Sequence, residues 1–147
     1  MPELYSVAID GPSGAGKSTL AKAAAADLGI CYVDTGAIYR TIGYGVYCRG
    51  IDPSDTVVLP DATVNIFLTA APEVRAMRRC RELEQRGTPQ PYEQVLRDIV
   101  DRDWADSHRD IAPLCKAEDA VELDTGALTF DESLRLLLDT IRRRAGL

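Results

Sequence analysis

Gly-Pro-Ser-Gly-Ala-Gly-Lys-Ser, at residues 11–18, is the stretch that decides the fold. Its glycines, lysine and final hydroxyl follow the spacing G-x-x-x-x-G-K-[ST] of a phosphate-binding loop. Such a loop joins a strand to a helix, and its backbone N–H groups, together with the positive end of the helix dipole, form a cradle for anions. Residues 5–9 before it favour a strand, and the alanine-rich residues 19–28 after it favour a helix. The stretch therefore predicts a nucleoside triphosphate site.

Two side chains of the loop have the chemistry that a triphosphate requires. Lys17 can reach the β- and γ-phosphates, and the Ser18 hydroxyl can be a ligand of Mg²⁺. The predicted triphosphate-binding residues are Gly11, Pro12, Ser13, Gly14, Ala15, Gly16, Lys17, Ser18 and Thr19.

The composition is that of one ordinary globular domain. The chain has 147 residues, of which 46% are hydrophobic and 27% charged. No apolar run approaches membrane-spanning length and the N-terminus has no signal-peptide core, so we expect a cytoplasmic protein without membrane contact. The four cysteines form no C-x-x-C pair and are expected to be free thiols, and a single histidine argues against a multi-histidine metal site.

The charge pattern favours local phosphate sites. The net charge of −6 disfavours nonspecific nucleic-acid binding, and we expect no nucleic-acid partner. Of the basic residues, fourteen are arginine and three are lysine. Because arginine grips phosphate with a planar two-pronged donor, this bias indicates individual phosphate-binding side chains.

Strand-like and helix-like segments alternate, which predicts an α/β fold around a parallel sheet. Thr129 and Glu132 have the spacing of a capping box at the start of the last helix. The predicted strands cover residues 5–9, 30–33, 64–68 and 120–123, and the predicted helices cover 17–28, 36–48, 72–86, 92–107 and 130–144.

Two groups of charged residues have helical spacing. Arg75, Arg78 and Arg79 fall on one helix face, and Arg102, Asp106 and Arg109 share another if the helix extends that far. From the residues alone, each group is either a phosphate-binding face or a solvated face with ordinary surface ion pairs.

Four blocks together resemble bacterial cytidylate kinases, the (d)CMP kinases of the nucleoside monophosphate kinase family. The phosphate loop with the preceding Ile9-Asp10 is the first. The resemblance extends over nearly the whole chain, in the family's order. The other three blocks are Asp34-Thr35-Gly36-Ala37-Ile38-Tyr39-Arg40, Thr56-Val57-Val58-Leu59-Pro60-Asp61-Ala62, and Arg102-Asp103-Trp104-Ala105-Asp106-Ser107-His108-Arg109 with the Asp110–Leu114 segment after it.

The resemblance implies a three-layer P-loop sandwich that transfers phosphate from ATP to CMP or dCMP with Mg²⁺. It implies that Thr35 and Arg40 contact the acceptor, with Arg40 on its phosphate. It also places Asp106 near cytosine, and Lys17, Arg102 and Arg109 near the phosphates as the catalytic residues. It implies that the helix carrying Arg75, Arg78 and Arg79 leads into a lid over ATP, formed by about residues 75–110, and that at least one of these arginines touches the transferring phosphates.

The resemblance also implies that a segment is missing. Family members carry an inserted small domain, which closes over CMP, between the positions of Asp55 and Thr56. They also carry a central strand that ends in Gly-Arg-Asp, a tripeptide that this sequence lacks. We therefore expect a single core domain over residues 1–147 with one central strand fewer.

Several consequences of the missing strand stay open. The neighbouring strands could close together, residues 57–59 could form a stub, or a second chain could supply the edge. The resemblance implies a monomer, whereas the third arrangement would give a dimer. The alternative to an active kinase is a nucleotide-binding remnant without turnover.

Overall fold

The computed structural model describes residues 5–34, 62–110 and 113–147, and its core is a parallel three-stranded sheet. The strands are β1 (Val7–Asp10), β2 (Val64–Thr69) and β3 (Val121–Asp124), in the order β1-β2-β3. Val7 pairs with Val64, and Ile66 pairs with Val121. This arrangement confirms the predicted α/β class with a parallel sheet.

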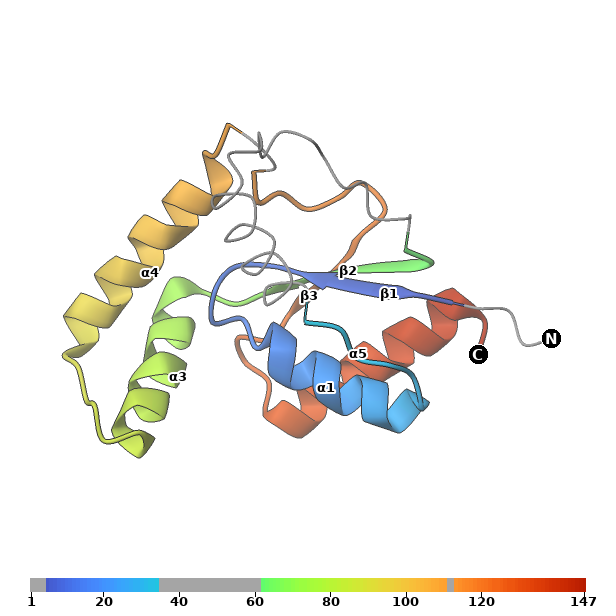
Figure 1. The fold of residues 1–147 in the computed structure, drawn as a ribbon, viewed down its shortest axis with the longest axis horizontal. Coiled ribbons are helices and arrows are strands. Elements are labelled where there is room, and N and C mark those ends of the chain that lie inside the picture. The colour runs from blue at the N-terminus through green and yellow to red at the C-terminus, as the bar shows by residue number, and fades with distance from the viewer. Residues whose placement is uncertain (1–4, 35–61, 111–112) are drawn as a thin grey trace, which may run out of the picture.

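One face of the sheet is covered by α1 (Lys17–Leu28) and α5 (Phe130–Ala145), which lie side by side beneath it in Figure 1. Alternate residues of the strands point toward these helices, as the period of two requires. Ile66, Leu68 and Leu137 are almost completely buried in the resulting core. Burial of these side chains holds α5, the last element, against β2 in the middle of the sheet.

The helices α3 (Pro72–Gln85) and α4 (Tyr92–Ser107) form a separate antiparallel pair beyond the end of the sheet (Figure 1). Pro72 opens α3, where its missing N–H costs nothing. A second small core of Ala76, Leu83, Val95 and Ile99 joins the two helices. Because α3 follows β2 and the phosphate loop follows β1, the helix pair and the loop both lie at the carboxyl end of the parallel strands.

One predicted strand, at residues 30–33, is not formed, and one predicted helix lies outside the described residues. Residues 30–33 are not in a strand: Tyr32 lies with its ring under the Lys22 ammonium of α1, at 5.5 Å. Local propensity is enough for an extended chain, but a strand also needs a hydrogen-bonded neighbour, which the sequence segment cannot supply by itself. The predicted helix 36–48 lies outside the described residues, as does the stretch 56–59.

The remaining boundaries agree with prediction to within two residues. Helices α1 and α4 have the predicted ends, and the last helix begins with the predicted capping box of Thr129 and Glu132. Three of the four cysteines are described, and Cys31, Cys80 and Cys115 are free thiols. Within residues 5–34, 62–110 and 113–147, no helix has both the length and the apolarity to cross a membrane.

Candidate phosphate-binding cleft

The phosphate loop follows β1 directly and bends at three glycines with positive φ. Gly11 has a φ of 142°, and a Cβ built there would lie 2.0 Å from the main-chain oxygen of Leu68 in β2. Gly16, with a φ of 93°, precedes the first residue of α1, and no side chain caps that helix end. The first N–H groups of α1 are therefore presented to the loop, where they favour an anion.

Lys17 folds back across this loop. Its Nζ donates hydrogen bonds to the main-chain oxygens of Gly11, at 2.6 Å, and Pro12, at 3.0 Å. Burial is the largest influence on its pKa and lowers it from 10.5; Arg102 and Arg75 also lower the pKa, whereas Asp10 and Asp106 raise it. Lys17 is thus a partly desolvated cation with both carboxylates and arginines nearby. A bound phosphate would stabilise its charged form.

Two arginines of the last family block, Arg102 and Arg109, lie close to the Asp106 carboxylate. Arg102 Nε lies 3.7 Å from Asp106 Oδ2, and Arg109 Nη1 lies 3.9 Å from Asp106 Oδ1. Helix α4 ends at Ser107, so Arg109 is beyond it and returns by donating from Nε to the main-chain oxygen of Asp106 at 3.3 Å. Both arginines are more than half exposed. Exposed ion pairs of this length hold their partners weakly, so both guanidinium groups can turn to a phosphate.

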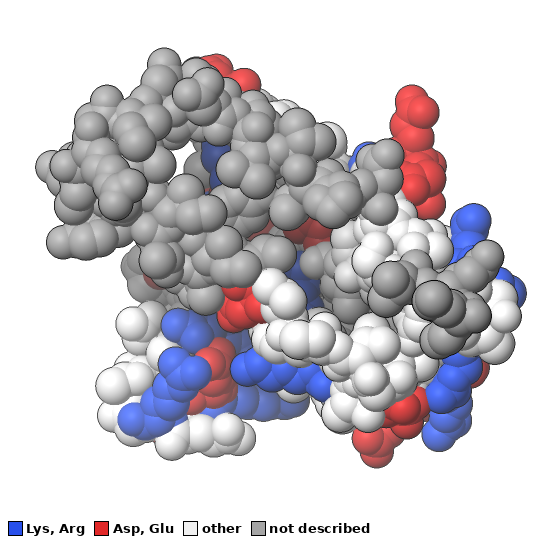
Figure 2. Space-filling model, turned by 45° about the vertical axis from the view of Figure 1, so that its right-hand side comes forward, with Lys and Arg blue, Asp and Glu red and all other residues white. Residues whose placement is uncertain are grey.

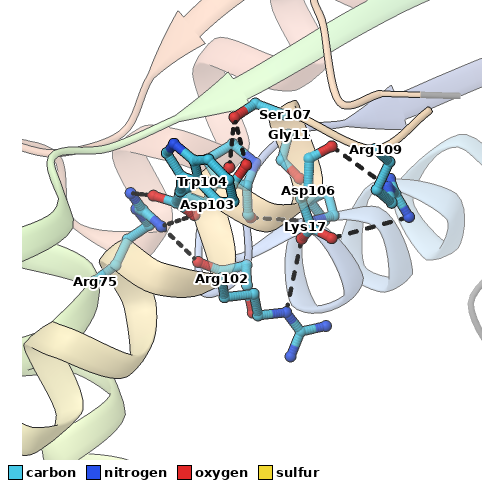
Figure 3. Close-up of polar contacts among 11 residues, drawn as sticks. Gly11, Lys17, Arg75, Arg102, Asp103, Trp104, Asp106, Ser107 and Arg109 are labelled. Carbon is cyan, nitrogen blue, oxygen red and sulfur yellow. Dashed lines mark hydrogen bonds and ion pairs between the residues drawn. The ribbon is translucent and has the colours of Figure 1, made fainter. Parts of the chain in front are cut away.

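One cleft of about 240 Å³ is lined both by the phosphate loop with Lys17 and by Arg102, Asp106 and Arg109, whose side chains are drawn in Figure 3. Lys17 and Arg102 are more than eighty positions apart in the sequence, and both line this cleft. Three cationic side chains and two carboxylates share the cleft. Its lining residues are Asp10, Gly11, Ser13, Lys17, Arg102, Asp106, Arg109 and Leu114.

The three arginines of α3 lie in three different environments. Arg75 is buried, with 2% of its surface exposed, and its guanidinium is bonded to protein acceptors. Arg78 donates to the hydroxyl and the main-chain oxygen of Thr125, the residue after β3. Arg79 forms an exposed pair with Glu82 at 2.8 Å, and its hydrogen bond lowers the pKa of that carboxyl. Arg79 is therefore a solvated residue with an ordinary surface ion pair, whereas Arg75 is a buried cation.

The remaining predicted site residues are of two kinds. Thr35 and Arg40 lie outside the described residues. Ser18 and Thr19 are exposed in the first turn of α1, beside the loop. The Ser18 hydroxyl and the Asp10 carboxylate are the hard oxygen donors that Mg²⁺ prefers, and they lie at opposite ends of the same loop. The chemistry of these two donors therefore fits a magnesium ion.

Sequence reasoning missed Asp10, Asp103 and Leu114. Asp10 ends β1, and its Oδ1 accepts a hydrogen bond from the Gly11 N–H at 2.7 Å. Its place immediately before the loop was a usable signal. Asp103 instead pairs with Arg75, 28 residues away, and no local spacing reveals that contact. Leu114 joins the cleft because its N–H donates to the main-chain oxygen of Asp106 at 2.7 Å.

Figure 2 shows basic and acidic side chains lying next to one another over the lower part of the described surface. Among the described ion pairs, Arg86, which directly follows α3, lies 2.5 Å from Glu82, and Arg142 lies 2.7 Å from Asp27. Part of the positive charge of the described residues is therefore held in local ion pairs.

Comparison with known proteins places these features in one family. The cytidylate kinase family model matches residues 7–57 and 52–143. The cytidylate kinase of Fervidobacterium nodosum is 34% identical over 211 aligned positions, which cover 94% of this chain and 96% of that protein. That of Shouchella clausii is 32% identical over 223 positions, covering 99% of both chains. That of Thermosipho melanesiensis is 33% identical over 213 positions, covering 96% of this chain and 98% of that protein.

These alignments are longer than the 147 residues of this chain, so the relatives contain residues that have no counterpart here. The two segments matched by the family model meet at residues 52–57, where the sequence resemblance places the missing segment. With a family model that covers most of its length, the chain belongs to the cytidylate kinase family.

Proposed function

We propose that this chain transfers the γ-phosphoryl group of Mg·ATP to the phosphate of CMP or dCMP. An oxygen of the acceptor phosphate attacks the γ-phosphorus, the bond between that phosphorus and the β,γ-bridging oxygen breaks, and ADP and CDP or dCDP leave. The acceptor phosphate is already an anion, so no general base is required. The chain must therefore hold two polyanions in line and offset the charge on the moving group.

The donor side of the proposal rests on the phosphate loop. Its N–H groups and the start of α1 would cradle the β- and γ-phosphates, and Lys17 would exchange its bonds to Gly11 and Pro12 for bonds to phosphate oxygens. Ser18 would hold the Mg²⁺, which would offset part of the negative charge of the phosphates. Of the α3 arginines, we assign contact with ATP to Arg78 or Arg79.

The acceptor side rests on α4 and the residues after it. Arg102 and Arg109 would bind phosphate oxygens, and Asp106 would orient the cytosine. Thr35 and Arg40 would complete the acceptor site. The observation that carries the proposal is the single cleft in which Lys17 lies with Arg102 and Arg109, because a phosphoryl group can pass only between groups held in one place.

The proposal extends to the organisation of the chain. Residues 1–147 would be one kinase core without the small acceptor domain, with residues 75–110 as a lid-like segment. It would act as a cytoplasmic monomer, with ATP and CMP or dCMP as its small-molecule partners and neither nucleic acid nor membrane among them.

A second function is favoured by one sequence observation. The chain lacks the Gly-Arg-Asp of its family, and with it an arginine for the acceptor and a carboxylate near the metal. A protein with this loss would bind ATP at the phosphate loop without turning it over.

ADP release from Mg·ATP, followed with and without CMP on freshly purified monodisperse protein, separates the two functions. We expect ADP formation that depends on CMP, and its absence from folded protein that binds ATP would establish the remnant. Asp106→Asn should raise the KM for CMP about tenfold or more, since it removes a charged hydrogen-bond acceptor. Asp98→Asn is the matched control, because Asp98 is an exposed α4 carboxylate bonded only to Gln94 among the contacts described for it.

A further inference from the structure

The guanidinium of Arg75 joins three separate elements. From α3 it donates through Nε to the main-chain oxygen of Ala70, the residue after β2, at 2.8 Å. Through Nη1 it donates to the main-chain oxygen of Ser13 in the phosphate loop, at 3.0 Å, and to Asp103 Oδ1 of α4, also at 3.0 Å. Through Nη2 it donates to Asp103 Oδ2 at 2.5 Å. Figure 3 shows this two-pronged pair on the side of α4 next to Arg102.

Burial makes this bridge stiff. The Arg75 side chain is 3% exposed and the Asp103 side chain 27%. In every other ion pair of the described residues, at least one side chain is more than 40% exposed. The stem of Arg75 also packs on the loop, because a Cβ built at Gly14 would lie 3.4 Å from its Cβ. A buried, two-pronged arginine–carboxylate pair fixes the relative orientation of its partners as well as their distance.

The two ends of the bridge are next to the two halves of the cleft. Ser13 lines the cleft on the side of the phosphate loop, and Asp103 adjoins Arg102 on the side of α4. A shift of either end would change the distance between Lys17 and the arginines of α4. Displacements of about 1 Å can cost about a hundredfold in rate when two reacting groups must be held in line.

We infer that Arg75, through Asp103, is a positioning residue that sets the phosphate loop and the arginines of α4 at the spacing phosphoryl transfer requires. Its N–H groups are directed at protein oxygens, so it acts through Ser13 and Asp103 and does not touch the nucleotide. The catalytic consequence rests on the proposed kinase function, whereas the mechanical coupling of the two segments does not.

The kinetic test uses Arg75→Lys, Asp103→Asn and the double variant in the full chain. Each is expected to lower kcat for CMP-dependent ADP formation about 10- to 100-fold and to change the KM for ATP less than about threefold. Because both residues belong to one bridge, the double variant should be no slower than the slower single variant. Arg86→Lys, at the exposed residue that directly follows α3, and Asp98→Asn, at an exposed residue of α4, should leave kcat unchanged.

Two kinetic outcomes would overturn the inference. An unchanged kcat in folded Arg75→Lys would show that the bridge has only a structural role. An increase in the KM for ATP as large as the fall in kcat would show that Arg75 is an ATP ligand.

Hydrogen exchange tests the coupling without any turnover. In Arg75→Lys and in Asp103→Asn, amide exchange should rise together in residues 11–18 and 99–109, with residues 130–145 unchanged. Faster exchange in only one of the two segments, or throughout the chain, would refute the coupling. If the wild-type chain formed no CMP-dependent ADP, the proposed function would fail, and the exchange pattern would still decide whether the bridge couples the segments.

Discussion

The ammonium of Lys17 lies 2.6 Å from the main-chain oxygen of Gly11, so the lysine near the end of the phosphate loop is bonded to the glycine that begins it. This bond closes the loop on itself. The Gly11 N–H is meanwhile bonded to Asp10, so one glycine is held from both sides. A bound triphosphate would have to replace the bond from Lys17, and this exchange makes Lys17 informative about both stability and binding.

Lys17→Met should weaken the binding of Mg·ATP about 10- to 100-fold, because a charged hydrogen bond to phosphate is worth about 1.5–3 kcal/mol. It should not lower the melting temperature of the ligand-free protein, because burial makes the charged lysine costly there. Calorimetric titration and thermal unfolding measure the two effects. Lys22→Met, an exposed change on the same helix, should alter neither; a loss of ATP affinity there as large as in Lys17→Met would refute the assignment.

The stability difference between wild type and Lys17→Met should depend on alkaline pH. The folded pKa of Lys17 is lowered below 10.5, so in the window between that lowered pKa and 10.5 the unfolded chain binds more protons than the folded chain. Unfolding free energy therefore rises with pH in this window. Urea unfolding between pH 8 and about 10.5 should show wild type gaining stability relative to the variant. A relative loss over the same range would mean that folding raises this pKa.

Gly11→Ala should be far more destabilising than Gly87→Ala. At Gly11 the φ is 142° and the new Cβ would meet the main chain of Leu68, whereas Gly87 has a φ of 74° and open space around it. Both changes carry the cost of positive φ, but only Gly11→Ala must also move β2. We expect a difference of at least about 2 kcal/mol in unfolding free energy, measured in urea. Equal losses would show that the contact with β2 is readily relieved.

Thr129→Ala should remove the capping box of α5 and lower stability by about 1 kcal/mol. The Thr129 hydroxyl accepts a bond from the Glu132 N–H, and the N–H and hydroxyl of Thr129 both donate to the Glu132 carboxylate. Thermal unfolding should show a melting temperature lower by about 2–4 °C. Thr88→Ala, in the loop between α3 and α4, is the control and should unfold as wild type does.

The same box predicts an acid dependence. The bonds from Thr129 lower the pKa of Glu132 below 4.5, so their stabilising effect is present above 4.5 and is lost as pH falls through the lowered value. The difference between wild type and Thr129→Ala should therefore shrink in acid. A difference that grew in acid would contradict this assignment.

The elements that sequence predicted well are those with local causes. The phosphate loop is contained in residues 11–18, the ends of α1 and α4 follow from their own residues, and the Thr129 cap depends on spacing within one turn. The pairing of Arg102 with Asp106 likewise follows from helical periodicity. Residues 30–33 show the limit of such reasoning, because an extended segment becomes a strand only if another part of the chain pairs with it.

The sequence by itself therefore determined that this chain has a phosphate loop between a strand and a helix, a parallel α/β core, and two arginine sets with helical spacing. The tertiary structure alone decided which members of those sets face the cleft. It buried Arg75 against Ser13 and Asp103, 62 and 28 residues away, and it placed Lys17 opposite Arg102. The physical reason is one of range: propensity, caps and periodicity act over a few residues, whereas burial and charge pairing depend on which distant segments the packing of the sheet and helices brings together.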